Sequence, residues 1–180
     1  MKSLFDFIVE PVGQRYNNKV KVGDKSLIIN TQSESFKSVN NIAKVINVPL
    51  IYKTKIKKGD LIIIHHNVFR RWYNIRGEEK NSRSYFKNGL YFVNQDQIYL
   101  YKRNKKWMAF DNRCFVSPIK NYDNTNASSE QSLIGILKYG NSALEALGIN
   151  EEDLVGYKPF GEFDFVVDGK RLYCMKSNDI

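Results

Sequence analysis

The chain has two histidines and two cysteines, the side chains that most often bind transition metals. His65 and His66 are adjacent, and neighbouring side chains of a strand point to opposite faces of a sheet. Cys114 and Cys174 are 60 residues apart and form no Cys-x-x-Cys pair. We therefore expect no metal site, a structural or surface role for both histidines, and two reduced thiols in a cytoplasmic protein.

The acidic residues show no pattern of acid–base catalysis. Asp60 follows Gly59 and Asp153 follows Glu152, each just before an apolar run. An aspartate in such a turn bonds to the nearby backbone, and we expect that role for both. The sequence has no nucleophile elbow, no phosphate-binding loop and no pair of carboxylates at catalytic spacing. It therefore predicts a protein without enzyme activity and without a cofactor.

Basic residues give the strongest alternative signal of a binding function. The 28 Lys and Arg outnumber the 19 Asp and Glu, for a formal charge of +9, and many lie beside aromatic residues. A small barrel with cations and aromatic rings on one face binds single-stranded nucleic acid by charge and stacking. The alternative interpretation is solvated loops plus core aromatics. The candidate nucleic-acid contacts are Arg70, Arg71, Trp72, Tyr73, Lys102 and Arg103.

Composition predicts an all-β fold. The chain of 180 residues has 11 Tyr, 11 Phe and 2 Trp, and aromatic residues pack well on short strands. Turn signals recur at intervals of about 10 residues, as in small barrels and sandwiches. No apolar run approaches the roughly 20 residues that span a membrane. Met1–Ile8 lacks the small-residue cleavage site of a signal peptide, so we expect a cytoplasmic protein without a membrane partner.

Alternation and turn residues place the expected elements along the chain. Ser142–Leu147 is expected to form one short helical turn that ends at Gly148. The polar ranges 31–41 and 121–132 are expected to be loops. Strands are expected over 5–12, 19–29, 42–48, 61–65, 73–76, 90–93, 98–101, 114–119, 133–139, 154–157, 163–167 and 172–175.

Four segments of the first part of the chain recur, in the same order, in the second part. The displacements are 107 residues (Pro11 to Pro118), 92 (Ala43 to Gly135), 93 (Asp60 to Asp153) and 82 (Leu90 to Leu172). Four collinear matches predict an internal repeat, which determines the architecture. We expect two domains, 1–106 and 107–180; the alternative is an all-β chain with chance similarity between strands.

Each copy resembles a GroES-type co-chaperonin barrel. That family has an opening strand with proline, a Gly-Asp-hydrophobic turn, and a final Leu-x-x-x-x-x-x-Asp-Ile type of strand. The first copy has Pro11, Gly59-Asp60-Leu61 and Leu90 through Asp96 to Ile98. The second has Pro118, Asp153-Leu154-Val155 and Leu172 through Asp179-Ile180. The resemblance implies two tandem small GroES-like β-barrels and a co-chaperonin, which caps the chamber of a nucleotide-bound chaperonin as a homo-oligomeric ring.

Members of this family bind the chaperonin through a mobile loop with three successive aliphatic residues. Leu27, Ile28 and Ile29 stand in the corresponding interval, so the resemblance implies that they contact the chaperonin. A loop of this kind orders on an apolar groove, and a ring of weak sites gains from multivalency. The alternative is that 27–29 is simply a buried strand. The second copy is polar in the matching interval, so we expect only the first to bind.

Three departures from the family lead to other hypotheses. Two barrels per chain resemble the tandem co-chaperonins of plastids, whereas the basic, Asn-rich composition resembles that of a phage protein in the host cytoplasm. The segment Gly77–Ser84 has no counterpart in the family. The second copy reaches Ile180 without a match to Tyr99–Tyr101, so we expect its barrel to lack a closing strand unless another chain supplies it or the sequence is cut short. A phage structural or assembly protein that uses the same barrels is a further hypothesis.

Overall fold

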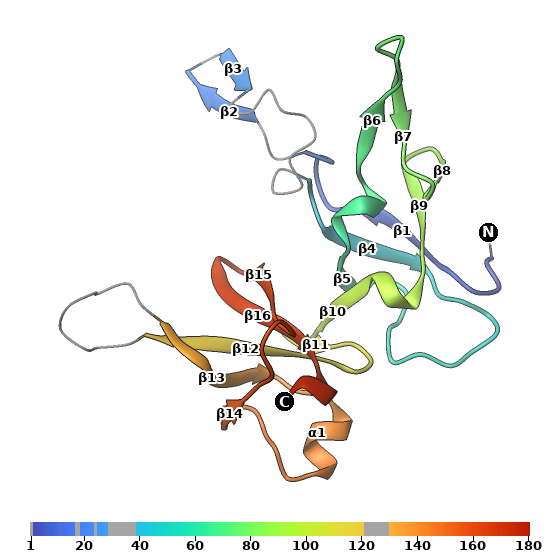
Figure 1. Cartoon of the computed structure of the whole chain (residues 1–180). Helices are drawn as coiled ribbons and strands as arrows, with labels where there is room; N and C mark the ends of the chain where they lie inside the picture. Colours follow the sequence, from blue (N-terminus) through green and yellow to red (C-terminus); the bar gives the residue numbers. More distant parts are fainter. Residues whose placement is uncertain (1, 17–18, 24, 29–38, 121–129) are drawn as a thin grey trace. The chain divides into compact units, whose positions relative to one another are not determined.

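The computed structural model describes residues 2–16, 19–23, 25–28, 39–120 and 130–180 (Figure 1). Strands predominate, and the described residues include one short α-helix, α1 (Ser142–Ala146), so the expected all-β class is confirmed. The chain divides into two compact units, Met1–Asn104 and Lys105–Ile180. We refer to them as the first and the second unit.

The first unit is built on six paired strands and two hairpins. The paired strands follow the order β10-β5-β4-β1-β9-β8. Their bounds are β1 (Phe7–Pro11), β4 (Ile42–Asn47), β5 (Leu61–Ile64), β8 (Tyr85–Lys87), β9 (Leu90–Val93) and β10 (Ile98–Arg103). The hairpins are β2 (Lys19–Val22) with β3 (Lys25–Ile28) and β6 (Arg71–Tyr73) with β7 (Glu79–Asn81), and the 3-10 turns are η2 (His66–Val68) and η3 (Gln95–Gln97).

The second unit has a five-stranded sheet in the order β14-β13-β12-β16-β15. Its central strand β12 is buried on both faces at Cys114, Phe115 and Val116, whereas the edge strands β14 and β15 are largely exposed. The elements are β11 (Lys106–Ala109), β12 (Arg113–Lys120), β13 (Glu130–Tyr139), β14 (Leu154–Gly156), β15 (Phe163–Val167), β16 (Lys170–Lys176) and the 3-10 turn η4 (Ser177–Asp179).

Both units pair their strands in the same order and in the same register. β1 lies between β4 and β9, and β12 lies between β13 and β16. The register shifts between Ile8 and Val9 in β1, and at the matching position, between Phe115 and Val116, in β12. Residues that are paired across neighbouring strands in the first unit have counterparts in the second that are paired as well. Each counterpart is found by adding the displacement of its segment in the sequence repeat. The matching pairs are Pro11–Ala43 and Pro118–Gly135, Val9–Tyr91 and Val116–Tyr173, and Ala43–Ile62 and Gly135–Val155. The sequence repeat is therefore a repeat of strand pairing.

The turn that leads into β5 or β14 is also repeated in detail. The Asp60 carboxylate accepts from the Lys57 N–H at 2.8 Å, and the Asp153 carboxylate accepts from the Asn150 N–H at 2.7 Å. The preceding residue has a positive φ in both copies, +92° at Gly59 and +75° at Glu152. The turn role expected for the two aspartates is confirmed, and it closes a tight loop in which the backbone needs that left-handed conformation.

The expectation of closed barrels is wrong, because both sheets are open. β14 and β15 end the second sheet and do not pair with each other, and β8 ends the first. A barrel closes only when its two edge strands pair along a sufficient length. The first sheet has β8 at an edge and the second has β14. Each of these strands has only three residues, which is too short for a long ladder with the opposite edge of its own sheet. The described residues therefore form twisted open sheets, and a GroES-like barrel stays a prediction.

The strands expected from the sequence differ from the observed ones mainly in the polar hairpins. Of the expected strand 73–76, only Tyr73 is in a strand, as the end of β6. The rest is a turn in which the Asn74 side chain accepts from the N–H groups of Arg76 and Glu78, both at 3.0 Å. Strands β7, β8 and β11 were not predicted, and β13 begins at Glu130, inside the predicted loop 121–132. Strand β7, β8 apart from the partly buried Tyr85, and the first residues of β13 are mostly exposed, so they carry little of the apolar alternation that reveals a half-buried strand.

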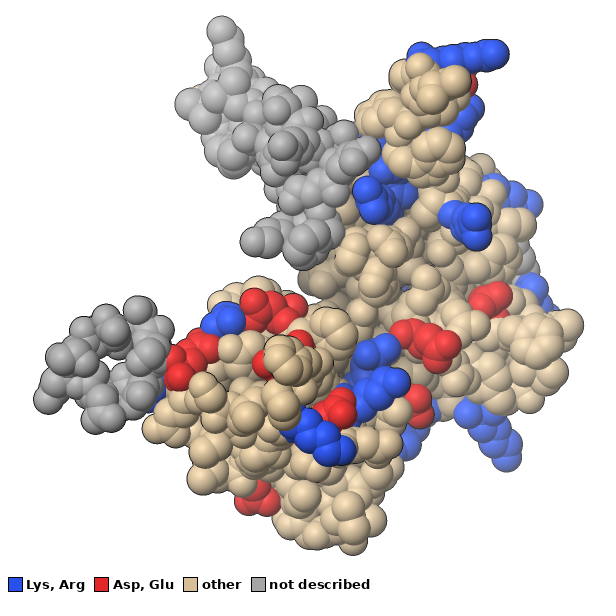
Figure 2. Space-filling model, in the orientation of Figure 1, with Lys and Arg blue, Asp and Glu red and all other residues tan. Residues whose placement is uncertain are grey.

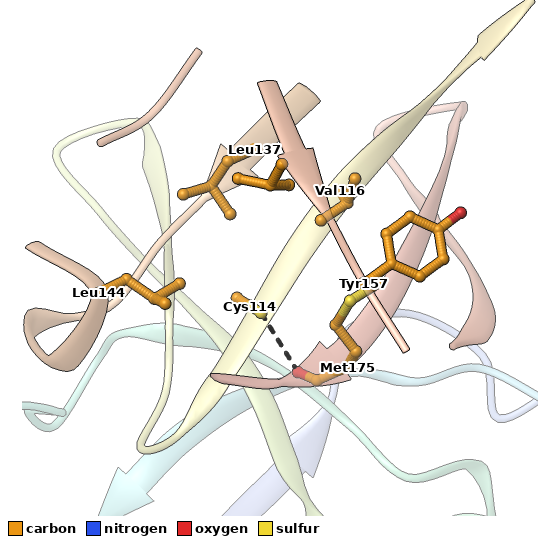
Figure 3. Packing of buried hydrophobic residues seen from close by; sticks show 7 residues of the cluster. Cys114, Val116, Leu137, Leu144, Tyr157 and Met175 are labelled. Carbon is orange, nitrogen blue, oxygen red and sulfur yellow. Dashed lines mark hydrogen bonds between the residues drawn. The ribbon is translucent and has the colours of Figure 1, made fainter. Parts of the chain in front are cut away.

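Helix α1 lies within the range expected for a helical turn, 142–147, and it contributes Leu144 to the core of the second unit. Asn141 caps it, since its side chain accepts from the N–H groups of Ala143 and Leu144, and Gly148 follows it with a φ of +81°. Leu144 packs into a cluster of buried residues drawn from β12, β13, β14 and β16 (Figure 3). The cluster consists of Cys114, Val116, Leu137, Leu144, Val155, Tyr157 and Met175.

Gly135 lies where β12 and β13 approach too closely for a side chain. A Cβ at this position would come within 2.3 Å of Val116 Cγ1 and 2.7 Å of the Ser117 carbonyl oxygen. We predict that Gly135→Ala destabilises the second unit by about 1–3 kcal/mol, because the backbone of β12 must shift. Denaturant unfolding, followed through fluorescence of the buried Trp107, measures the loss.

Gly156→Ala is the matched control, since the nearest atom to its Cβ would be 3.7 Å away. Its unfolding midpoint should stay close to that of the native chain. Equal midpoints for Gly135→Ala and the native chain would contradict the close approach of the two strands.

Candidate interaction sites

The proposed chaperonin-binding residues fall on the β2–β3 hairpin, which follows β1 in the chain. Leu27 pairs with Val20 and Ile28 with Lys19, so the backbone of both residues is in a β-ladder, while Ile29 lies outside the described residues. Gly23 forms part of the hairpin turn with a φ of +60°. The aliphatic segment is thus carried on a hairpin of its own, which forms a separate sheet from the six strands of the first unit.

A second candidate site is the arm, which we define as residues 71–81 and which consists of β6, its turn and β7. The arm also forms a separate two-stranded sheet, and Figure 1 shows it extending away from β10. Trp72 and Tyr73 are largely exposed, and Ile75 at the turn is fully exposed. Lys and Arg side chains lie at the end of the arm, blue in Figure 2. Exposed aromatic and basic residues of this kind are typical of interaction sites.

The guanidinium of Arg71 is engaged within the protein. Its Cζ lies 4.5 Å from the centre of the Tyr16 ring, and its Nη1 forms an ion pair with Glu79 at 3.0 Å. The Tyr16 hydroxyl accepts from the Arg71 backbone N–H at 2.8 Å, and the Tyr73 hydroxyl donates to Glu79 at 3.4 Å. Arg71 therefore stabilises the base of the arm, and contact with a ligand would compete with these bonds.

Arg15 joins the arm to the rest of the first unit. Its Nε and Nη2 donate to the Phe69 carbonyl oxygen at 3.1 and 2.9 Å, and its Nη1 donates to the Asn81 side chain at 2.8 Å. The guanidinium also lies 5.5 Å from the centre of the buried Tyr91 ring. Sequence analysis missed Arg15 because its partners are more than fifty residues away, and no local pattern marks such a contact.

The remaining predicted nucleic-acid contacts do not join the arm. Lys102 and Arg103 lie in β10, which pairs with β5, whereas Arg70 precedes β6 and Arg71, Trp72 and Tyr73 form it. Arg103 Nη2 bonds to Asp60 at 2.7 Å and to the Lys55 carbonyl oxygen at 2.5 Å. The hydrogen bond to Asp60 raises the pKa of Arg103, so this cation stabilises the turn before β5.

The two histidines differ from the expected strand geometry. β5 ends at Ile64, His65 caps η2 and His66 begins it, so the rings stack at a centroid distance of 4.3 Å instead of pointing to opposite faces. Burial lowers the pKa of His66, and the charges of His65 and Arg70 lower it further. Within the described ranges, no three His, Cys, Asp or Glu side chains gather in a metal-binding group.

Both cysteines are buried in the second unit. Cys114 faces Met175 across the sheet and donates to its carbonyl oxygen at 3.6 Å (Figure 3), whereas Cys174 faces Phe115. Paired residues of neighbouring strands share a face, so the two thiols lie on opposite faces of the sheet. Burial raises the pKa of Cys114 to about 12 and that of Cys174 to about 11, which keeps both thiols protonated near neutral pH.

The sequence matches no protein-family model and no curated protein. Among the residues that the structure describes, no helix is long and apolar enough to cross a membrane.

We predict that Arg15→Ala loosens the arm without unfolding the sheet. The change removes bonds from a charged donor to Phe69 and Asn81, and such bonds contribute about 1.5–3 kcal/mol each. Amide hydrogen exchange should therefore become at least tenfold faster in β6 and β7 and stay unchanged in β1 and β4.

Arg83→Ala serves as the control, because Arg83 is an exposed arginine next to the arm. It should leave exchange in the arm unaltered. Unchanged exchange in Arg15→Ala would show that the arm is held by other contacts.

Proposed function

We propose that the protein is a co-chaperonin, which closes the chamber of a nucleotide-bound chaperonin and performs no chemistry itself. One observation carries the proposal. The two units repeat one strand order and one register, and an aliphatic hairpin, β2–β3, lies between β1 and β4, the first two strands of that order in the first unit. That is the interval in which the co-chaperonin family carries its binding segment.

The difference between the two copies supports a division of roles. The second unit repeats the pairing of β5, β4, β1, β9 and β8, but the sequence of its matching interval, Tyr122–Gln131, is polar throughout. A short aliphatic segment binds an apolar groove weakly, and it needs several copies in one assembly to bind tightly. The first unit would therefore contact the chaperonin, the second would serve as scaffold, and the chain would act as a homo-oligomeric ring.

The change Ile28→Asp tests the proposal directly. A carboxylate cannot enter an apolar groove without losing its hydration, so binding to the chaperonin should fall at least a hundredfold. Co-sedimentation with a chaperonin from the same cell, in the presence of ATP, measures the binding. Circular dichroism checks that the sheets remain folded.

Ile51→Asp is the matched control, because Ile51 is an exposed isoleucine of the first unit outside the hairpin. It should bind as the native chain does. A native chain that stays monomeric in sedimentation, and that ignores the chaperonin with and without ATP, would contradict the proposal.

The arm supports a second candidate function, binding of single-stranded nucleic acid. Trp72 faces Lys80 across the β6–β7 pair, and the Lys87 ammonium lies 5.1 Å from the centre of the exposed Phe86 ring. A base stacked on an exposed aromatic ring next to a cation is the usual arrangement in such proteins.

For this candidate, Trp72→Ala should weaken binding of a labelled oligothymidylate by about tenfold, since stacking contributes about 1–3 kcal/mol per base. Fluorescence anisotropy at several salt concentrations measures the affinity. The control Phe163→Ala removes an exposed ring from the second unit and should have no effect. Equal affinities for the two variants would eliminate the arm as a nucleic-acid site.

A further inference from the structure

The repeat reveals a difference at one sheet edge. In the first unit β10 pairs with β5, in a register that sets Leu100 against Ile63, Tyr101 against Ile62 and Lys102 against Leu61. The strand that matches β5 in the second unit is β14. Among the described residues, no strand pairs with the outer edge of β14.

The backbone groups at this edge are oriented as those that bind β10 in the first unit. Val45 N–H donates to the Asp60 carbonyl oxygen and Ile64 N–H to that of Asn41, so the backbone groups of Leu61 and Ile63, which alternate with these, point to β10. Leu137 N–H and Tyr157 N–H make the same bonds to Asp153 and Leu133. The backbone groups of Leu154 and Gly156 therefore point away from β13, as donors and acceptors for a further strand.

The side chains at the edge match those of β5 and specify which strand fits. Leu154, at the position of Leu61, is 65% exposed. Gly156 stands where the first unit has the buried Ile63, and the only atom within 4 Å of a Cβ built there lies at 3.7 Å. An aromatic side chain on an incoming strand fills the space above a strand glycine. The fitting strand has a long side chain opposite Leu154, as Lys102 is opposite Leu61, and an aromatic one opposite Gly156.

Charge adds one more requirement. In the first unit Arg103, the residue after Lys102, forms an ion pair with Asp60 at 2.7 Å. Asp153 occupies the position of Asp60 and is exposed. The neighbouring residues Glu151 and Glu152 form ion pairs with Lys106 and Lys138. Asp153 forms no ion pair with another residue of the described part of the chain. An arginine that follows the incoming strand would complete the same pair.

We propose that the outer edge of β14 binds an extended segment of another protein by β-strand addition, and that the segment has the pattern of β10, with an aromatic residue opposite Gly156 and an arginine at its end. In strand addition, main-chain hydrogen bonds supply affinity, and side-chain positions supply specificity. A second copy of the chain cannot donate β10, because its β10 is already paired with its own β5 and buries Ile98 and Leu100.

The test uses the full-length protein and a fluorescent synthetic peptide with the sequence of residues 97–104. Anisotropy should show saturable binding. Because Leu100 lies opposite Ile63, whose backbone groups point to β10, N-methylation of the peptide at Leu100 should weaken binding about tenfold through one lost hydrogen bond. N-methylation at Tyr101, which points away from the edge, should change little. Leu100→Phe in the peptide should bind more tightly than the parent.

Two protein variants locate the site. Leu154→Lys places a cation at the edge against a basic peptide and should weaken binding about tenfold, whereas Leu147→Lys, at a leucine that is 77% exposed but lies after α1, should not. Asp153→Asn and Arg103→Ala in the peptide should each weaken binding about threefold, and together no more than either alone.

Three outcomes would overturn the proposal. One is absence of binding to the native protein at about 1 mM peptide, and another is equal affinity of the two N-methylated peptides. The third is self-association of the native chain that Gly156→Pro abolishes, because it would assign the edge to a second copy. The N-methylated pair needs no change in the protein, so it decides the question even if a variant misfolds.

Discussion

The structure depends on one constraint: the first strand of each unit's repeated pattern forms backbone hydrogen bonds along both of its edges. β1 lies between β4 and β9, and β12 lies between β13 and β16. A slip of one residue would turn every side chain of such a strand to the opposite face. Both strands are buried on both faces, at Phe7, Ile8 and Val9 and at Cys114, Phe115 and Val116, so a slip would disrupt close packing on each side of the sheet. The loops between the paired strands can differ without disturbing this pairing.

The variable parts of the molecule are therefore the ones that bear on function. The first unit carries the β2–β3 hairpin and the arm. The second unit carries α1 and an outer β14 edge with which no other described strand pairs. Arginine is used in a consistent way across these parts. Arg15 and Arg71 fix the arm, Arg103 pairs with Asp60, and Arg171 pairs with Glu130 and Asp164. The formal charge of +9 is thus a weak guide to a binding face, because many of the cations are engaged in intramolecular contacts.

Sequence patterns predicted the central elements well and the exposed ones poorly. The bounds of β9 and β15 are those expected, and α1 forms within the expected range 142–147, before Gly148, because alternation and a glycine stop are local signals. Strand β7 was missed because it is short and fully exposed, and β11 because its four residues are too few to show a clear period. The histidines were placed in a strand that ends one residue earlier, and this changed their relative orientation.

The sequence by itself determined that the chain is all-β, that it contains one pattern twice, and which residues of each copy correspond. These properties follow from alternation and turn residues, which act over a few neighbouring positions. Only the tertiary structure decided that the sheets of the described residues stay open, that Arg15 joins β6 and β7 to the first unit, and which backbone groups of β14 point away from β13. Those features arise from contacts between distant parts of the chain, where a side chain's partner is set by the fold and not by its neighbours in sequence.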